Sequence, residues 1–189
     1  MKKITTLIAA IAITTLTFAQ NTYTLDKMHS RLSFSVFHMG ISFIEGNFKT
    51  FDATLISTKE DFSDAKIEMT ADVKSFNTEV EMRDNDLRDN WFEAAKFPTI
   101  VFKSTSFKKI SGKKYKLAGN ITMHGITKPI VFDVVYNGKT QSPFSKKNVV
   151  GFTITGKLKR SDFGVGKDAL STGVSEDVEL KSNVELIVN

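Results

Sequence analysis

The stretch YKLAGNITMHGITKPIVFDVVY, residues 115–136, contains two runs of alternating apolar and polar side chains on either side of His124-Gly125. Successive side chains of an extended strand point to opposite faces, so each run predicts a strand with one apolar face. A glycine-containing pair between two such runs is typical of a turn, and we expect turns also at Ser111-Gly112 and Asn137-Gly138. The apolar faces consist of Tyr115, Leu117, Gly119, Ile121, Met123, Ile130, Phe132, Val134 and Tyr136.

The same period of two continues along most of the chain. Six further strands are predicted at residues 32–36, 46–56, 65–73, 100–102, 150–158 and 178–188. Phe48 and Phe51 break the strict alternation of their strand, which indicates a bulge near Lys49 or Thr50. Eight antiparallel strands with one apolar face close most simply into a barrel, because closure leaves no exposed strand edge. The predicted fold class is therefore all-β, an eight-stranded antiparallel barrel.

Residues 78–92, TEVEMRDNDLRDNWF, interrupt this alternation. Thr78 and Glu81 have the spacing of a capping box, in which each side chain satisfies a free backbone amide of the first helical turn. The apolar stripe of such a helix consists of Val80, Leu87 and Trp91. Pro98 prevents the helix from continuing. We therefore expect one amphipathic helix, at about 78–92, that lies across one end of the barrel.

The first twenty residues, MKKITTLIAAIAITTLTFAQ, have the features of a secretory signal peptide. Two lysines precede an apolar run diluted with threonine, and Thr17 and Ala19 have small side chains. The run is shorter than the roughly 20 apolar residues that a membrane-spanning helix requires. We predict a signal peptide at residues 1–19, one barrel domain at residues 20–189, and export to the periplasm. The sequence has no cysteine, so an exported domain must fold without disulfides.

Composition and motifs argue against several classes of function. The chain has 26 Lys and Arg against 21 Asp and Glu, and these charges are scattered, so no nucleic-acid partner is predicted. Of its three histidines, His29 and His38 would face opposite ways on one strand, which disfavours a shared metal site. The sequence contains neither the G-x-S-x-G nucleophile motif nor a dinucleotide-binding glycine pattern. We expect no catalytic activity, no metal and no cofactor.

Five blocks of the sequence carry a family resemblance. The blocks are DKMHSRLSFSVFHMGIS (26–42), GNFKTFDATL (46–55), SFNTEVEMRDNDLRDNWFEAAKFPTIVFKS (75–104), LAGNITMHGITKPIVFDV (117–134) and LKRSDFGVG (158–166). In this order they resemble the signature blocks of the YceI-like, polyisoprenoid-binding family. The resemblance implies a lipocalin-like barrel that is exported to the periplasm. Its tunnel would hold the chain of an isoprenoid quinone or a polyprenyl phosphate, for carriage or storage.

The inward side chains of such a barrel would line an apolar tunnel. We predict that the ligand contacts Phe34, Val36, His38, Ile67, Met69, Phe102, Leu117, Ile121, Phe132, Val134, Phe152, Ile154 and Leu180. His38 would mark one end, although a buried histidine bonded to a neighbouring carbonyl is an equal alternative. A barrel filled by its own side chains, acting through protein contacts, also stays open. A small outer-membrane barrel fits less well, because the outward faces are charged and Trp and Tyr are few.

The head group of the ligand could be a phosphate or a quinone ring. Arginine is the natural partner of a phosphate, and the chain has Arg31, Arg83, Arg88 and Arg160. Arg31 alternates with Leu32 and would point outward, whereas Arg83 and Arg88 each follow a carboxylate by four residues and predict surface ion pairs. A neutral quinone needs only hydrogen-bond donors, which could be His38, Ser30 or Thr78. We favour the quinone slightly, and a transient membrane contact and a homodimer are further partner predictions.

Overall fold

The computed structural model describes residues 20–167 and 173–189, so the predicted signal peptide at 1–19 lies outside the described residues. The strands are β1 Asn21–Leu25, β2 Arg31–His38, β3 Ser42–Phe48, β4 Phe51–Ser57, β5 Lys66–Asp72, β6 Phe76–Asn77, β7 Thr99–Ser111, β8 Lys114–Met123, β9 Ile126–Gln141, β10 Asn148–Lys159 and β11 Val174–Val188. The helical segments are α1 Glu81–Asp86, a π-helical turn at Leu87–Trp91, and 3₁₀ turns at Val73–Ser75 and Arg160–Phe163. Within these described parts of the chain, no helix has the length and apolar character to cross a membrane.

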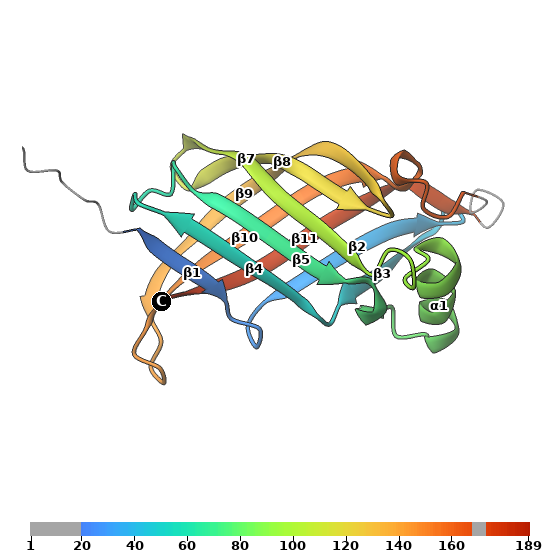
Figure 1. Cartoon of the computed structure of the whole chain (residues 1–189), viewed down its shortest axis with the longest axis horizontal. Coiled ribbons are helices and arrows are strands. Elements are labelled where there is room, and N and C mark those ends of the chain that lie inside the picture. Colours follow the sequence, from blue (N-terminus) through green and yellow to red (C-terminus); the bar gives the residue numbers. More distant parts are fainter. Residues whose placement is uncertain (1–19, 168–172) are drawn as a thin grey trace, which may run out of the picture.

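The strands close into a barrel (Figure 1). Antiparallel neighbours follow in the order β1-β4-β5-β7-β8-β9-β10-β11, and β11 pairs back with β1. Along one edge of β11, residues 186–188 pair with β1 and residues 174–183 pair with β2. β1 and β2 thus act as one interrupted strand, as do β3 and β4, which are separated at the predicted irregularity of Lys49 and Thr50. The closed eight-stranded antiparallel barrel confirms the predicted fold class.

An aromatic plug fills the end of the barrel at which β1 begins. It consists of Tyr23, Phe62, Phe107, Tyr115, Tyr136 and Phe152. The ring centroid of Phe62 lies 5.4 to 5.6 Å from those of Tyr23, Tyr136 and Phe152, in edge-on geometry. Aromatic pairs of this kind add about 0.5–1.5 kcal/mol to the burial of their surface. The packed rings of the plug therefore close this end of the barrel.

The connection between β4 and β5, which carries Phe62, is held by one carboxylate. Asp64 accepts hydrogen bonds from the hydroxyls of Ser57 and Thr58, each at 2.5 Å, and from the amide of Thr58 at 2.9 Å. Because these bonds favour the charged form, they hold the pKa of Asp64 far below its ordinary value. Asp64 thus fixes the loop that positions the plug.

Two of the three predicted turns are present and one is not. Gly112 and the pair His124-Gly125 have positive φ and join β7 to β8 and β8 to β9. Residues 137–138, in contrast, lie inside β9, which continues to Gln141. The register with β10 shifts between Gly151 and Phe152, opposite this pair, so the expected turn is a β-bulge. The asparagine–glycine signal marked an irregular backbone, but the strand continues through it.

The predicted helix at 78–92 is shorter than expected, and its capping box was wrong. The N-cap residue is Val80, whose side chain makes no capping hydrogen bond. The Thr78 hydroxyl instead donates to the buried carboxylate of Asp84 at 2.6 Å. The surface ion pairs expected for Arg83 and Arg88 are also replaced, because both side chains bond to uncharged oxygens. The buried Asp84 carboxylate therefore accepts the Thr78 hydroxyl, which the capping box would have used at the start of the helix.

Candidate functional site

The barrel encloses an apolar cavity of about 250 Å³. Protein interiors rarely contain voids much larger than a water molecule. The volume of the cavity lies just below the roughly 300–1,000 Å³ of small-molecule sites. A bound ligand is therefore the simplest explanation for the cavity.

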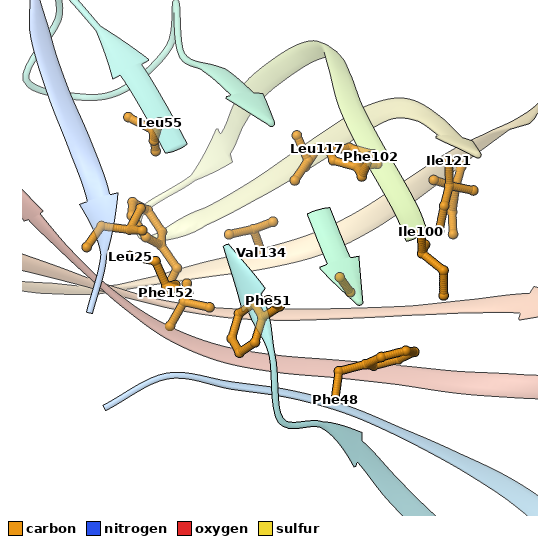
Figure 2. Close-up of a cluster of buried hydrophobic side chains, with 14 of the residues drawn as sticks. Leu25, Phe48, Phe51, Leu55, Ile100, Phe102, Leu117, Ile121, Val134 and Phe152 are labelled. Atoms are coloured by element: carbon orange, nitrogen blue, oxygen red, sulfur yellow. The ribbon is translucent and has the colours of Figure 1, made fainter. Parts of the chain in front are cut away.

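Side chains from all eight barrel strands converge on this cavity. Figure 2 shows Leu55, Phe102 and Val134 projecting from different strands toward one shared interior. Twelve of the thirteen predicted contact residues line the cavity: Phe34, Val36, Ile67, Met69, Phe102, Leu117, Ile121, Phe132, Val134, Phe152, Ile154 and Leu180. They do so because alternate residues of a strand share one face. Their contact with a ligand stays a prediction.

His38 and Ser30, two predicted polar positions, lie outside this lining. His38 ends β2 between Ser42 of β3 and Val174 of β11, one inward position beyond Val36. His38 is therefore level with Val174 at the mouth but is not itself among the lining residues, and its role as the end of the cavity stays a prediction. The Ser30 hydroxyl accepts a hydrogen bond from the amide of Glu185 at 3.0 Å, at the corner between β1 and β2. Neither side chain is among the residues that line the cavity.

The lining also contains residues that the sequence prediction omitted. They include Leu32, Ile44, Phe48, Phe51, Phe76, Asp86, Leu87, Trp91, Phe92, Arg83, Arg160 and Val174, whereas Thr78, which also lines the cavity, had been predicted as a possible head-group donor. Leu32 shares the alternation of β2, and Leu87 and Trp91 share the predicted helical stripe, so the sequence carried a signal for these. Arg83 carried none, because its spacing from a carboxylate suggested a surface ion pair.

The lining residues indicate that the cavity opens at one end of the barrel, the end at which Figure 1 shows α1. Lining residues near the aromatic plug, such as Leu55 and Phe152, are buried, whereas Asp86 and Val174 at the opposite end are partly or fully exposed. The mouth is framed by β2, β3, the start of β11 and the helical segment after β6. A chain-like ligand would therefore enter at this end and point toward the plug.

A small polar cluster stands at the mouth. One carboxylate oxygen of Asp84 accepts the amide of Thr78 at 2.8 Å and its hydroxyl at 2.6 Å. The Arg83 guanidinium donates from Nε to the Thr78 hydroxyl at 2.7 Å and from Nη2 to the Thr78 carbonyl at 2.8 Å. Arg83 Nη1 has no hydrogen-bond partner among residues 20–167 and 173–189. Arg83, a lining residue held in place by these two bonds, thus has one guanidinium nitrogen that no described residue bonds.

Arg160, the second arginine of the lining, is fully engaged. Its side chain is buried, and Nε donates to the Ser175 carbonyl at 3.0 Å. The four remaining N–H groups are directed at the carbonyls of Val165, Gly166 and Val174 and at the Glu176 carboxylate. All five donors of the guanidinium are therefore used in joining residues 165–166 to the start of β11. Arg160 is a structural clamp, with no donor left for a ligand.

Outside the cavity, the sequence brings one histidine and two carboxylates together. Asp26, His29 and Glu185 place their potential ligand atoms within 4.8 Å of one another. His29 Nδ1 already bonds to the Asp26 carboxylate at 2.9 Å, and this bond, together with the Asp26 charge, raises the pKa of His29. His124, in contrast, bonds to Glu93 at 2.8 Å. The closeness of Asp26 and His29 is thus explained by the turn between β1 and β2, which their hydrogen bond stabilises.

The fold and the cavity define a closed eight-stranded β-barrel of lipocalin-like architecture with an apolar interior open at one end. The chain belongs to the YceI-like domain family, whose model matches residues 23–186. It is similar to protein YceI of Salmonella arizonae, with 34% identity over 181 residues that cover 94% of this chain and 93% of the relative.

Solved structures are similar to the barrel as well. The crystal structure of the Campylobacter jejuni YceI protein has 35% sequence identity and a TM-score of 0.69, over 87% of this chain and 96% of that one. A polyisoprenoid-binding domain from Saccharophagus degradans has 14% identity and a TM-score of 0.65, over 88% of this chain and 98% of that one. At this low identity the second likeness shows the fold alone.

Proposed function

We propose that this protein binds an isoprenoid lipid in the barrel cavity, as an exported, periplasmic carrier or store. The observation that carries the proposal is the apolar cavity of about 250 Å³, closed by the aromatic plug and open beside α1. The family membership adds support, and a structural neighbour is named as a polyisoprenoid-binding domain. The chain of the lipid would lie along the inward faces of the strands.

The apolar lining favours a lipid tail but does not by itself select one. Transfer of each CH₂ group from water gains ~0.8 kcal/mol, whereas transfer from a membrane gains little because the membrane is equally apolar. Shape and head-group contacts must therefore decide the affinity. At the mouth, the polar side chains of the lining are Thr78, Arg83 and Asp86, and the lining also contains Thr54, Ser182 and Arg160.

The charges at the mouth favour a neutral head group such as a quinone. Arg83 can donate from Nη1 to one carbonyl oxygen. Asp84 and Asp86 lie beside it, so two carboxylates oppose one guanidinium, which disfavours a phosphate dianion. Arg160, the other arginine of the lining, has used its donors. An isoprenoid quinone is therefore the ligand that we propose.

We propose binding without catalysis for the same site. Among the described residues, the polar groups of the lining are few, and the most buried, Arg160 and Thr78, already make hydrogen bonds within the protein. A reaction would require a positioned nucleophile or a proton-transfer group at the place where substrate lies. The apolar surroundings of the tail supply neither.

The direct test is chemical. The protein is purified from its native host without detergent, extracted with organic solvent, and the extract is analysed by mass spectrometry. An isoprenoid quinone in near-stoichiometric amount is the expected result, with a mature N-terminus at Gln20 in the intact-protein mass. An extract without any isoprenoid would favour the alternative of a ligand-free barrel that acts through protein contacts.

A further inference from the structure

The hairpin between β2 and β3 exposes a set of apolar side chains that the barrel does not use. Phe37, Met39, Ile41 and Phe43 are 38%, 65%, 81% and 59% exposed. Residues 37–44, FHMGISFI, contain no Lys, Arg, Asp or Glu. Single exposed apolar residues are common on proteins, but a group of four at one hairpin indicates a contact surface.

The turn between β2 and β3 does not require apolar side chains. Met39 and Gly40 both have positive φ, at 52° and 71°, and the Ile41 amide donates to the His38 carbonyl at 3.1 Å. This is a type I′ turn, whose first central position strongly favours Asn or Asp over residues with larger side chains. A methionine there is both strained and exposed. The apolar tip therefore serves a purpose other than forming the turn.

The tip stands next to the mouth of the cavity. Val36 of β2 and Ile44 of β3 line the cavity, and the exposed tip follows directly from them. The helix α1, which carries the 80%-exposed Met82, lies at the same end of the barrel (Figure 1). An apolar surface thus continues from the outside of the hairpin over the rim and into the interior.

We propose that the β2–β3 tip inserts into the surface of an uncharged bilayer, so that the lipid passes between membrane and cavity without crossing water. The identity of the cargo rests on the proposed function, whereas the docking surface rests on the hairpin. Residues 37–44 carry no charged side chain and the strand continues into the exposed Glu45, so the hairpin offers no cation to an anionic surface. Insertion of apolar side chains is then the driving force, and the partner is a zwitterionic lipid surface.

The test uses the full mature protein and phosphatidylcholine vesicles that contain no isoprenoid. The variant Met39→Asn/Ile41→Ser removes two apolar tips and retains the turn, because Asn suits its position. We expect co-sedimentation with the vesicles to fall about tenfold or more. The control Phe144→Ser removes a 94%-exposed ring from the turn between β9 and β10. This turn lies near the C-terminal end of β11, where residue 149 pairs with residue 187, and not at the β2–β3 tip. The control should therefore sediment like wild type.

Equal sedimentation of wild type and the Met39→Asn/Ile41→Ser variant would overturn the proposal, as would an equal loss in Phe144→Ser. A second copy of the chain is the competing occupant. If the wild type is a dimer that the double variant converts to a monomer, and vesicle binding is unchanged, the tip is a dimer contact and the proposal fails. Replacing part of the phosphatidylcholine by phosphatidylglycerol should weaken wild-type binding, and stronger binding would contradict the charge argument.

A second measurement separates this proposal from the proposed function. Quinone uptake from vesicles is followed for wild type and the double variant. Slower uptake by the variant, with unchanged retention once loaded, supports docking. Wild-type uptake rates in the variant would overturn docking while leaving the function intact. Vesicle binding by a wild type that never takes up quinone would leave docking supported and contradict the function.

Discussion

Gly46 of β3 and Phe34 of β2 are cross-strand partners, and the Phe34 ring occupies the space that a side chain at position 46 would need. A Cβ at Gly46 would lie 2.8 Å from Cε1 of that ring and 2.9 Å from a methyl group of Thr78. Phe34 in turn packs edge-on against Phe76, with ring centroids 5.5 Å apart. Because Gly46 has no side chain, the Phe34 ring can lie close to Thr78 of the polar cluster at the mouth.

Gly46→Ala should therefore disturb both the fold and the cavity. Overpacking of this kind costs about 1–3 kcal/mol, and the displaced ring would move into the space for the ligand. Urea denaturation and the amount of retained lipid measure the two effects. In the control Gly151→Ala the nearest atom lies 3.5 Å away, so its stability should change little. Equal behaviour of the two variants would contradict the packing argument.

Asp64→Asn should loosen the loop that carries Phe62. The pKa of Asp64 is lowered in the folded state, chiefly by the Ser57 hydroxyl and then by Thr58. Its contribution is therefore fully present above the unfolded value of about 3.9, and is lost as the pH falls toward the folded value. We expect a loss of about 1–2 kcal/mol at pH 7, from hydrogen bonds to a charged group.

Urea midpoints of wild type and Asp64→Asn at pH 7, 4 and 2.5 test this dependence. The gap between the two proteins should narrow as the pH falls. Asp133→Asn, which removes an exposed ion pair with Lys116, should change stability by less than about 1 kcal/mol. A gap between wild type and Asp64→Asn that is constant with pH would show that the carboxylate charge of Asp64 is not what holds the loop.

Arg160→Met should destabilise the barrel strongly without changing which lipid is bound. The substitution leaves four carbonyls and the Glu176 carboxylate without their donor, at a cost of about 3 kcal/mol. Arg160→Lys should recover only part of this, because an ammonium has three donors and no planar fork. A stable Arg160→Met protein that loses its lipid would instead indicate a head-group role for Arg160.

Arg83→Met should weaken quinone binding about tenfold, the effect of losing one hydrogen bond from a charged donor. Arg88→Met is the matched control, since Arg88 bonds to the Lys74 carbonyl and to Asn85 and does not line the cavity. Titration of delipidated protein with an isoprenoid quinone measures the affinities. If both variants bind like wild type, Arg83 does not contact the head group.

Alternation predicted the barrel and most of its lining, because strand periodicity depends on each residue and its near neighbours alone. Residues such as Ile67 and Phe152 face the cavity for this reason. The capping box at Thr78 was wrong because Asp84, six residues later, is buried and takes the same hydroxyl. Burial of that kind depends on strands far away in sequence, which a local pattern does not report.

The ends of elements were harder to predict than their middles. The bulge at residues 137–138 has the same residue types as a turn, and only the pairing of β9 with β10 distinguishes them. His38 continues the inward face of β2, yet it is not among the lining residues although its partner Val174 is. Where a cavity stops is set by the helical segment that frames it, and the period of a strand carries no information about that.

The most direct test of the central claim compares two tryptophan variants by native mass spectrometry after purification from the native host. Val36→Trp places an indole in the cavity, whereas Val131→Trp places one on the exposed outer face of β9. The account predicts an isoprenoid adduct on wild type and on Val131→Trp, and its loss from a folded Val36→Trp. An adduct retained unchanged in Val36→Trp would place the lipid outside the cavity and contradict the account.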